Sequence, residues 1–327
     1  MTNRTTTEGM AAWLAAHDDF VILGHLAPDG DAAGATLGLC HALTSAGKRA
    51  AVCLPDGVPG LYADLPGAGS VVRAGERLPF APKTALAVDV SEYERLGPEG
   101  MAIFDACPSR GVIDHHATNP GFGQIMLLDG AAAAAGELAV EVLLAMGLEL
   151  DAAASECLFV AISTDTGHFS FSSTRPRTFR AAEQCLAKID LDAITARLYR
   201  TRTLARTKLL GLVLAGLQVS PDGRLAWAKL TQAMLDEAHA TKEDNEGIVN
   251  YLIEISGVVC AVLAQERDYG TKLSLRSTTA LDVATQVAIP LGGGGHACAA
   301  GASVPMSIDE ALERALELAR NAIIPGV

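Results

Sequence analysis

The stretch "FVILGHLAPDGDAAGATLGL", residues 20–39, begins as a buried strand and then breaks into a polar turn. Four apolar residues are soon followed by His25, and then by Asp29 and Asp31 beside Pro28 and glycine. The alanine- and leucine-rich segment that comes next predicts a helix. The stretch therefore predicts a strand, a loop and a helix, with an imidazole and two carboxylates where the strand ends.

The same alternation continues through the first half of the chain. Strands are expected at 19–24, 49–54, 84–89, 110–115 and 124–128, and helices at 7–17, 31–46, 131–146, 151–163 and 176–188. Short apolar strands that alternate with helices indicate an α/β fold with a doubly wound, mostly parallel sheet.

The pattern changes near residue 189, where an arginine-rich helical stretch predicts a connector. Beyond it we expect a hairpin of strands 215–219 and 224–230, a helix at 243–254, strands at 257–265 and 271–277, and helices at 281–289 and 307–322. The predicted organisation is a first domain over 1–190, a helical linker over 191–214 and a smaller α/β domain over 215–327.

Composition narrows the classes of protein. The chain has 327 residues, 50% of them hydrophobic and 19% charged, which is typical of a folded globular protein. A formal net charge of −13 argues against a protein that coats long nucleic acid. No apolar run reaches the roughly 20 residues of a membrane helix, and the N-terminus lacks a secretion signal, so a cytoplasmic location is expected.

The seven cysteines are scattered and form no C-x-x-C pair. Their spacing argues against a zinc ribbon and against a disulfide scaffold. Reduced, mostly buried thiols are expected.

Acidic and histidine residues recur at the predicted ends of strands and helices. They are His25, Asp29, Asp31, Asp89, Asp114, His115, His116 and Asp165. Ligands of doubly wound sheets gather at the carboxyl ends of the strands, so these side chains are expected to meet. Buried carboxylates without a partner are costly, and no matching cluster of Lys or Arg lies nearby in the sequence.

Divalent cations would offset the charge of these buried carboxylates. Four aspartates balance the charge of two such ions: Asp29, Asp31, Asp89 and Asp165. Oxygen ligands with imidazole and no thiolate favour Mn²⁺ or Mg²⁺ over zinc, and the imidazoles favour Mn²⁺. Two ions roughly 3.5–4 Å apart lower the pKa of a shared water and stabilise charge during displacement at phosphorus. Each motif alone also has a structural interpretation: Asp31 as a helix cap, for example, or a histidine of "DHH" in the core.

Four segments taken together resemble the phosphoesterase motifs of the DHH superfamily: "HLAPDGDAAG", "LAVDV", "IDHH" and "STDTG". The later "SLRST" and "GGGGHACAAG" resemble the DHH-associated domain. The length of the chain and its compact two-domain organisation are most similar to those of the bacterial nano-RNase and pAp-phosphatase group. RecJ-type nucleases are usually longer, and family II pyrophosphatases lack the "GGGGH" run. One departure is Ala35, where relatives often have serine.

The resemblance implies roles for individual residues. It implies one ion on His25, Asp29 and Asp89, and a second ion on Asp31, Asp89, His115 and Asp165. Asp89 would bridge the two ions, Asp114 would orient an imidazole, and His116 would touch the phosphate or protonate the leaving oxygen.

In the second domain, Arg276, Gly293, Gly294, Gly295 and His296 are expected to hold a substrate phosphate. Glycine permits close backbone approach to an anion, and arginine can grip a phosphate with two hydrogen bonds. By itself, the glycine run is equally compatible with a flexible loop, and Arg276 with a surface position.

The resulting hypothesis is a Mn²⁺-dependent phosphoesterase that acts on short oligoribonucleotides and on 3′(2′),5′-bisphosphate nucleotides such as pAp. Alternatives are a phosphodiesterase for cyclic dinucleotides or linear pApA, and a catalytically silent nucleotide-binding module. The expected partners are short single-stranded RNA or a nucleotide, with no long duplex and no membrane, and a homodimer is plausible.

Overall fold

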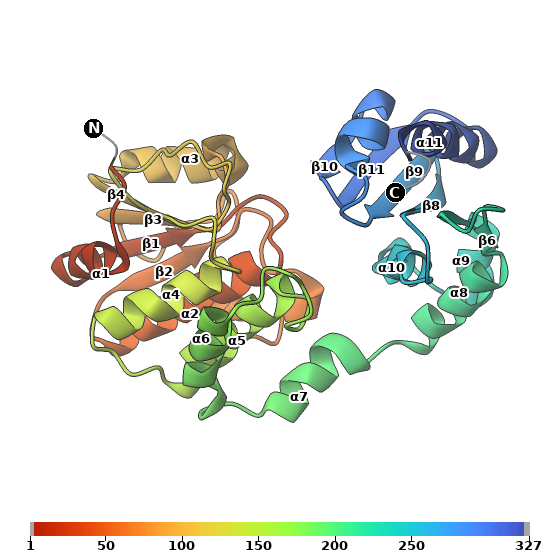
Figure 1. Cartoon of the computed structure of the whole chain (residues 1–327). Coiled ribbons are helices and arrows are strands. Elements are labelled where there is room, and N and C mark those ends of the chain that lie inside the picture. Colours follow the sequence, from red (N-terminus) through yellow and green to blue (C-terminus); the bar gives the residue numbers. More distant parts are fainter. Residues whose placement is uncertain (1–2, 324–327) are drawn as a thin grey trace. The chain divides into compact units, whose positions relative to one another are not determined.

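The computed structural model describes residues 3–323, which form two compact units that divide between Arg200 and Thr201 (Figure 1). The division falls inside the segment 191–214, which was expected to be a linker. The outer ends of the two expected domains, residues 1–2 and 324–327, lie outside the described residues.

The first unit is built on a five-stranded sheet in the order β2-β1-β3-β4-β5, and every neighbouring pair is parallel. The strands are β1 (Phe20–Leu23), β2 (Ala50–Cys53), β3 (Thr84–Val88), β4 (Ser109–Asp114) and β5 (Ile125–Leu128). The predicted doubly wound parallel sheet is therefore confirmed.

Helices cover both faces of this sheet. They are α1 (Thr7–Ala16), α2 (Gly30–Ser45), α3 (Gly97–Ala106), α4 (Ala135–Ala145), α5 (Ala152–Asp165) and α6 (Pro176–Leu186), with 3₁₀ helices at Gly60–Tyr62, Ala68–Ser70 and Tyr93–Leu96. Because side chains alternate along a strand, Phe20 and Ile22 pack with α1, α2, α4 and α5, whereas Val21 and Leu23 pack on the α3 side.

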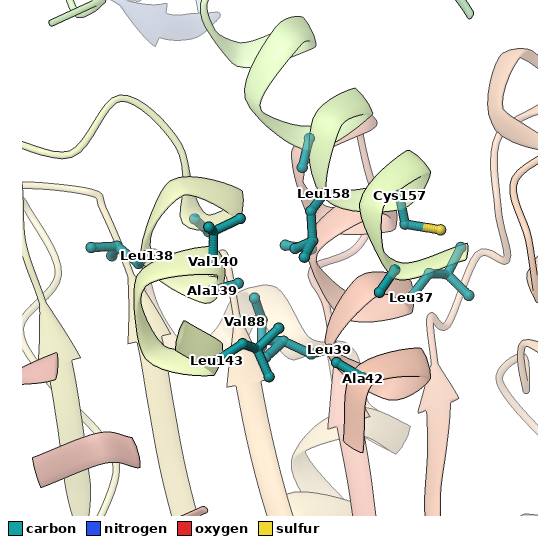
Figure 2. Packing of buried hydrophobic residues seen from close by; sticks show 14 of the residues in the cluster. Leu37, Leu39, Ala42, Val88, Leu138, Ala139, Val140, Leu143, Cys157 and Leu158 are labelled. Carbon is teal, nitrogen blue, oxygen red and sulfur yellow. The ribbon is translucent and has the colours of Figure 1, made fainter. Parts of the chain in front are cut away.

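The main core lies between the sheet and helices α2 and α4. Leu39 of α2, Leu143 of α4 and Val88 of β3 belong to the same fully buried cluster (Figure 2). α5 packs on the outer side of α2 and is covered in turn by α6. This helix layer fixes where α2 begins and where α5 ends.

The strand order creates a crevice between β1 and β3. From β1 the chain passes through α2 to β2 on one side, while β3 lies on the other side of β1 and leads through α3 to β4. Connections that diverge in this way leave the carboxyl ends of the two central strands uncovered. His25 follows β1 and Asp89 follows β3, so both residues start at this crevice.

α2 and α5 approach each other closely because α2 presents glycine to α5. A Cβ atom on Gly34 would lie 2.4 Å from the carbonyl oxygen of Cys157 and 2.8 Å from the amide nitrogen of Ala161. A Cβ on Gly38 would lie 2.5 Å from Leu158. Backbone atoms cannot move aside as a side chain can, so Gly34 sets the spacing of the two helices.

Two helices of the first unit differ from expectation. The expected helix 131–146 begins at Ala135, because residues 131–134 form turns that precede it. α3 was not expected, since the glycines and proline of "GPEGMAIFDA" suggest a loop; Pro98 lies in the first turn, where proline is tolerated.

The expected linker is helical over most of its length. It contains α7 (Leu191–Thr195), a π-helical turn (Ala196–Arg200) and most of α8 (Leu204–Ala215). α8 is part of the second unit, because its Leu209 and Val213 are buried against the sheet of that unit.

The second unit contains a six-stranded mixed sheet in the order β10-β11-β9-β8-β7-β6. Its remaining elements are β6 (Gln218–Val219), β7 (Leu225–Leu230), α9 (Gln232–Ala238), a 3₁₀ helix (Lys242–Asn245), α10 (Ile248–Ile253), β8 (Cys260–Arg267), β9 (Gly270–Ser277), a π-helical turn (Ala284–Ala288), a 3₁₀ helix (Ile289–Leu291), β10 (Gly294–His296), β11 (Ala299–Val304) and α11 (Ile308–Ala322). β7 pairs with β8 in parallel, and the other neighbours are antiparallel.

The predicted β6–β7 hairpin and the last helix are confirmed, and three expectations for this unit are corrected. The expected helix 281–289 is a π-helical turn followed by a 3₁₀ helix. The expected helix 243–254 is a 3₁₀ helix followed by α10, with Gly247 in a left-handed conformation between them. The glycine run enters β10, so the alternative of a flexible loop is wrong, and α9 and β11 were not expected.

All seven cysteines are free thiols, and five of them are buried. Within residues 3–323, no helix combines the length and the hydropathy that crossing a membrane requires.

We expect Gly34→Ala to lower the free energy of unfolding by about 1–3 kcal/mol, because the new methyl group meets backbone of α5. Gly211→Ala is the matched control, since Gly211 lies in α8 with nothing within 4 Å of its Cβ position. Urea denaturation of both variants measures the difference. Equal stability of the two variants would show that the α2–α5 spacing can adapt.

Candidate metal centre

His25 lies directly after β1 and is 6% exposed. Its Nδ1 is 2.7 Å from the carbonyl oxygen of Leu26, which accepts a hydrogen bond if the proton is on Nδ1. That tautomer leaves the Nε2 lone pair facing the crevice, 3.9 Å from Asp29 Oδ1 and 3.6 Å from Asp89 Oδ2. His25 therefore presents a nitrogen ligand atom to two carboxylates.

The two aspartates of the first loop have separate structural partners. Asp29 is the N-cap of α2, and its Oδ1 accepts hydrogen bonds from the amides of Asp31 and Ala32, each at 3.0 Å. The interpretation of Asp31 as the cap of this helix is therefore wrong.

Asp31 instead caps a helix that is distant in sequence. Its buried carboxylate accepts hydrogen bonds from the amides of Ala135 (2.6 Å) and Gly136 (2.9 Å), the first residues of α4. The positive end of that helix stabilises the negative charge of Asp31. The interaction also explains why α4 begins where it does, since Ala134 itself provides no capping side chain.

Asp89 occupies the centre of the site and is 2% exposed. Its backbone has φ of +59°, a left-handed conformation that is uncommon for residues other than glycine. Oδ1 lies 3.4 Å from Nε2 of His115, while Oδ2 faces His25. Among the described residues this buried Oδ1 has no hydrogen-bond partner, which is unusual for a carboxylate oxygen.

His115 and Asp165 complete a second group of ligand atoms with Asp31. Nε2 of His115 lies 3.7 Å from Asp31 Oδ2 and 3.4 Å from Asp165 Oδ2. Asp165 is the last residue of α5, so the close packing of α5 on α2 brings it to Asp31. Asp89 lies between this group and the one formed by His25 and Asp29.

The spacing and chemistry of these atoms fit divalent cations. Separations of 3.4–3.9 Å are long for hydrogen bonds. Two ligand atoms that are each about 2.1 Å from one ion lie roughly 3.0–3.4 Å apart, so only a small contraction is needed. The oxygens and imidazole nitrogens, with no thiolate, suit Mg²⁺ or Mn²⁺, and the partnerless Oδ1 of Asp89 is available to an ion.

Without cations, protons must offset the charge of this cluster. Burial lowers the pKa of His115, but the carboxylates of Asp89, Asp31 and Asp165 outweigh burial and raise it to about 10. Burial raises the pKa of Asp31 well above its usual value and that of Asp165 to about 6. Burial also acts to raise the pKa of Asp89, but His115 and His25 reverse this effect and lower it. Protons and cations therefore compete for the same atoms.

Asp114 and His116 adjoin the cluster, and Nδ1 of His116 lies 3.7 Å from Oδ1 of Asp89. Asp114, the last residue of β4, is fully buried, and its Oδ1 accepts a 2.8 Å hydrogen bond from Nδ1 of His116. Its Oδ2 accepts a hydrogen bond from Asn119 Nδ2, which also donates to the carbonyl of Val90. Asn119 thus joins the loops that carry Asp89 and the "DHH" segment. The sequence reasoning missed Asn119, because a single asparagine in a loop carries no distinctive signal.

In the second unit, the sheet register aligns Arg276 and His296. Arg276 of β9 pairs with Ala299 of β11, and Ala299 pairs with His296 of β10. Residues directly opposite in antiparallel strands share one face of the sheet, so the two side chains lie in one row. Arg276 Nε donates to Asn250 Oδ1 at 3.2 Å, which holds the guanidinium in place.

The glycine run is needed for close strand pairing. A Cβ on Gly293 would lie 2.1 Å from the carbonyl oxygen of Gly301, and one on Gly295 would lie 2.6 Å from that of Ala299. Gly294 faces open space, and β10 is an edge strand of the described sheet. The run therefore presents an exposed backbone edge beside His296.

Comparisons with known proteins agree with this architecture. Residues 19–162 match the DHH family, N-terminal domain, and residues 226–324 match the DHHA1 domain. The chain is 34% identical to the bifunctional oligoribonuclease and PAP phosphatase NrnA of Thermus thermophilus, over 92% of this chain and 89% of that relative. It is 26% identical to the NrnA of Bacillus subtilis, over 90% and 92% of the two chains.

A similar solved structure is that of an exopolyphosphatase-related protein from Bacteroides fragilis. It has a TM-score of 0.89 and 26% identity, and the match covers 96% of this chain and 95% of that one. Both domain matches and a full-length relative above 30% identity lead to the same assignment. The chain belongs to the DHH family of phosphoesterases, and within it to the NrnA-like group that carries a C-terminal DHHA1 domain.

Proposed function

We propose that this protein is a Mn²⁺-dependent phosphoesterase that hydrolyses short oligoribonucleotides and 3′(2′),5′-bisphosphate nucleotides such as pAp. The observation that carries the proposal is that His25 and His115 both face Asp89, whose buried Oδ1 accepts no hydrogen bond from the described residues. The names of the NrnA relatives support the substrate class.

The proposed ligands of one ion are His25, Asp29 and Asp89, and those of the other are Asp31, Asp89, His115 and Asp165. Two bound ions act as Lewis acids on the phosphate and make water a stronger nucleophile. The imidazoles favour Mn²⁺ over Mg²⁺. Asp89 holds the two halves of the site in register, because its two oxygens face different histidines.

His116 is placed to act on the leaving group. Its hydrogen bond from Nδ1 to Asp114 fixes the ring and leaves Nε2 free to donate a proton to the departing oxygen. The same hydrogen bond raises the pKa of His116, which favours the protonated, donating form. Asn119 restrains Asp114 from behind and so keeps the histidine in this orientation.

In this proposal, the DHHA1 domain binds the part of the substrate that is not hydrolysed. Arg276 and His296 would contact a terminal phosphate, and the backbone of Gly293, Gly294 and Gly295 would allow that phosphate to approach. The net charge of −13 supports a short substrate over long duplex nucleic acid. A cytoplasmic location and a homodimer remain predictions.

We expect the purified protein with Mn²⁺ to release mononucleotides from RNA dinucleotides and orthophosphate from pAp. Chromatography of the products from a panel that also contains cyclic and linear di-AMP measures this preference. A preference for cyclic di-AMP would replace the proposed substrate class. Failure to hydrolyse any member would refute the proposed function.

Asp89→Ala should abolish activity, leaving below about one per cent, because it removes a ligand from both ions. Elemental analysis should show less bound Mn²⁺ than in the wild type, and circular dichroism checks that the variant is folded. Wild-type metal content with full turnover would contradict the bridging role.

His296→Ala should raise KM more than it lowers the bound metal, because His296 belongs to the second unit, whereas all proposed metal ligands belong to the first. Gln218→Ala at the opposite edge of the same sheet is the control and should behave like the wild type. Steady-state kinetics on pAp and metal analysis separate the two effects. An equal loss of metal and of substrate affinity would count against the assigned role.

A further inference from the structure

Arg95 is a cationic side chain that contacts the candidate metal centre. It lies in the 3₁₀ helix Tyr93–Leu96, which follows β3, and it is exposed. Its carbonyl oxygen accepts a 2.7 Å hydrogen bond from the amide of Leu26, so its backbone is tied to the loop after β1. Its guanidinium nitrogen Nη2 lies 2.9 Å from Nδ1 of His25.

Nδ1 of His25 cannot donate a hydrogen bond to Leu26 and accept one from Arg95 at the same time. The carbonyl of Leu26, at 2.7 Å, requires a hydrogen on Nδ1, whereas an N–H of Arg95 requires a lone pair there. When Nε2 faces a cation, the hydrogen is on Nδ1 and the Leu26 contact is the one that forms. The hydrogens of the Arg95 guanidinium then need a different acceptor.

Arg95 forms no ion pair with a carboxylate among the described residues. None of the ion pairs found within residues 3–323 includes Arg95, whereas Arg49, Arg177, Arg197 and Arg200 each contact an acidic side chain. An unpaired guanidinium at the rim of a cation site suits an added anion.

Charge supports the same conclusion. The four aspartates of the cluster balance two divalent ions, so a bound phosphate leaves the loaded site with net negative charge. A guanidinium beside His25 compensates for that charge, and its planar fork matches two phosphate oxygens.

We propose that Arg95 binds a non-bridging oxygen of the phosphate that is hydrolysed. This inference rests on the proposed function and adds a phosphate contact from the first unit. It is separate from Arg276 and His296, which are assigned to the far phosphate. The reacting group is a phosphomonoester in pAp and a phosphodiester in a dinucleotide, and both have non-bridging oxygens, so Arg95 serves both substrates.

The test compares Arg95→Met and Arg95→Lys with the wild type as Mn²⁺-loaded full-length proteins. Isothermal titration calorimetry with orthophosphate measures binding without turnover, and elemental analysis measures the bound metal. We expect Arg95→Met to weaken orthophosphate binding about ten- to a hundred-fold with unchanged metal content. Arg95→Lys should recover part of the affinity, because it keeps the charge but not the fork. Arg77→Met, at an exposed arginine of the same unit, is the control and should bind as the wild type does.

Three results would overturn the inference. The first is that Arg95→Met binds orthophosphate with wild-type affinity. The second is that the wild type binds no orthophosphate at millimolar concentration. The third is that Arg95→Met loses metal, while the fraction that still carries metal binds orthophosphate with unchanged affinity. The last result would make Arg95 a positioning residue for His25. If the wild type hydrolyses no substrate of the panel, the proposed function fails, whereas the calorimetry still decides whether Arg95 binds phosphate.

Discussion

The candidate site depends on one buried carboxylate oxygen, Oδ1 of Asp89, which accepts no hydrogen bond within residues 3–323. Such a group is costly inside a protein unless a charge of opposite sign faces it. Histidines approach Asp89 from two directions, and the other carboxylates of the cluster add negative charge that cations or protons must offset. The architecture around β1 and β3 is therefore best understood as a scaffold that stabilises cations.

Much of this site could be predicted because parallel sheets bring distant residues together at one edge. His25, Asp89 and the "DHH" segment each follow an apolar strand, and the carboxyl ends of neighbouring strands meet whatever their separation in sequence. Asp165 could be predicted in a similar way, because it is the last residue of an apolar helix. The strand positions were predictable for a related reason: strands covered on both faces are continuous apolar runs.

The parts that could not be predicted depend on contacts between distant residues. The start of α4 is set by the carboxylate of Asp31, and nothing in the alanine run near residue 131 reveals this. Asn119 acquires its importance only from Asp114 and the carbonyl of Val90. Apart from His296 and Val304, β10 and β11 are built from glycine, alanine and serine, whose strand propensity is low, and close packing overrides that propensity.

The strand order also has a consequence for how the chain acquires its cations. Phe20 of β1 pairs with Thr84 of β3, and Asp31 accepts a hydrogen bond from the amide of Ala135. Both contacts join residues that are far apart in the sequence. Contacts between such distant residues slow folding, because a long loop must close before they form. On the ribosome the aspartates emerge one by one, each surrounded by water, and the cluster exists only after α5 has been synthesised. Ion capture is therefore a late step in maturation and cannot guide the early collapse of the nascent chain.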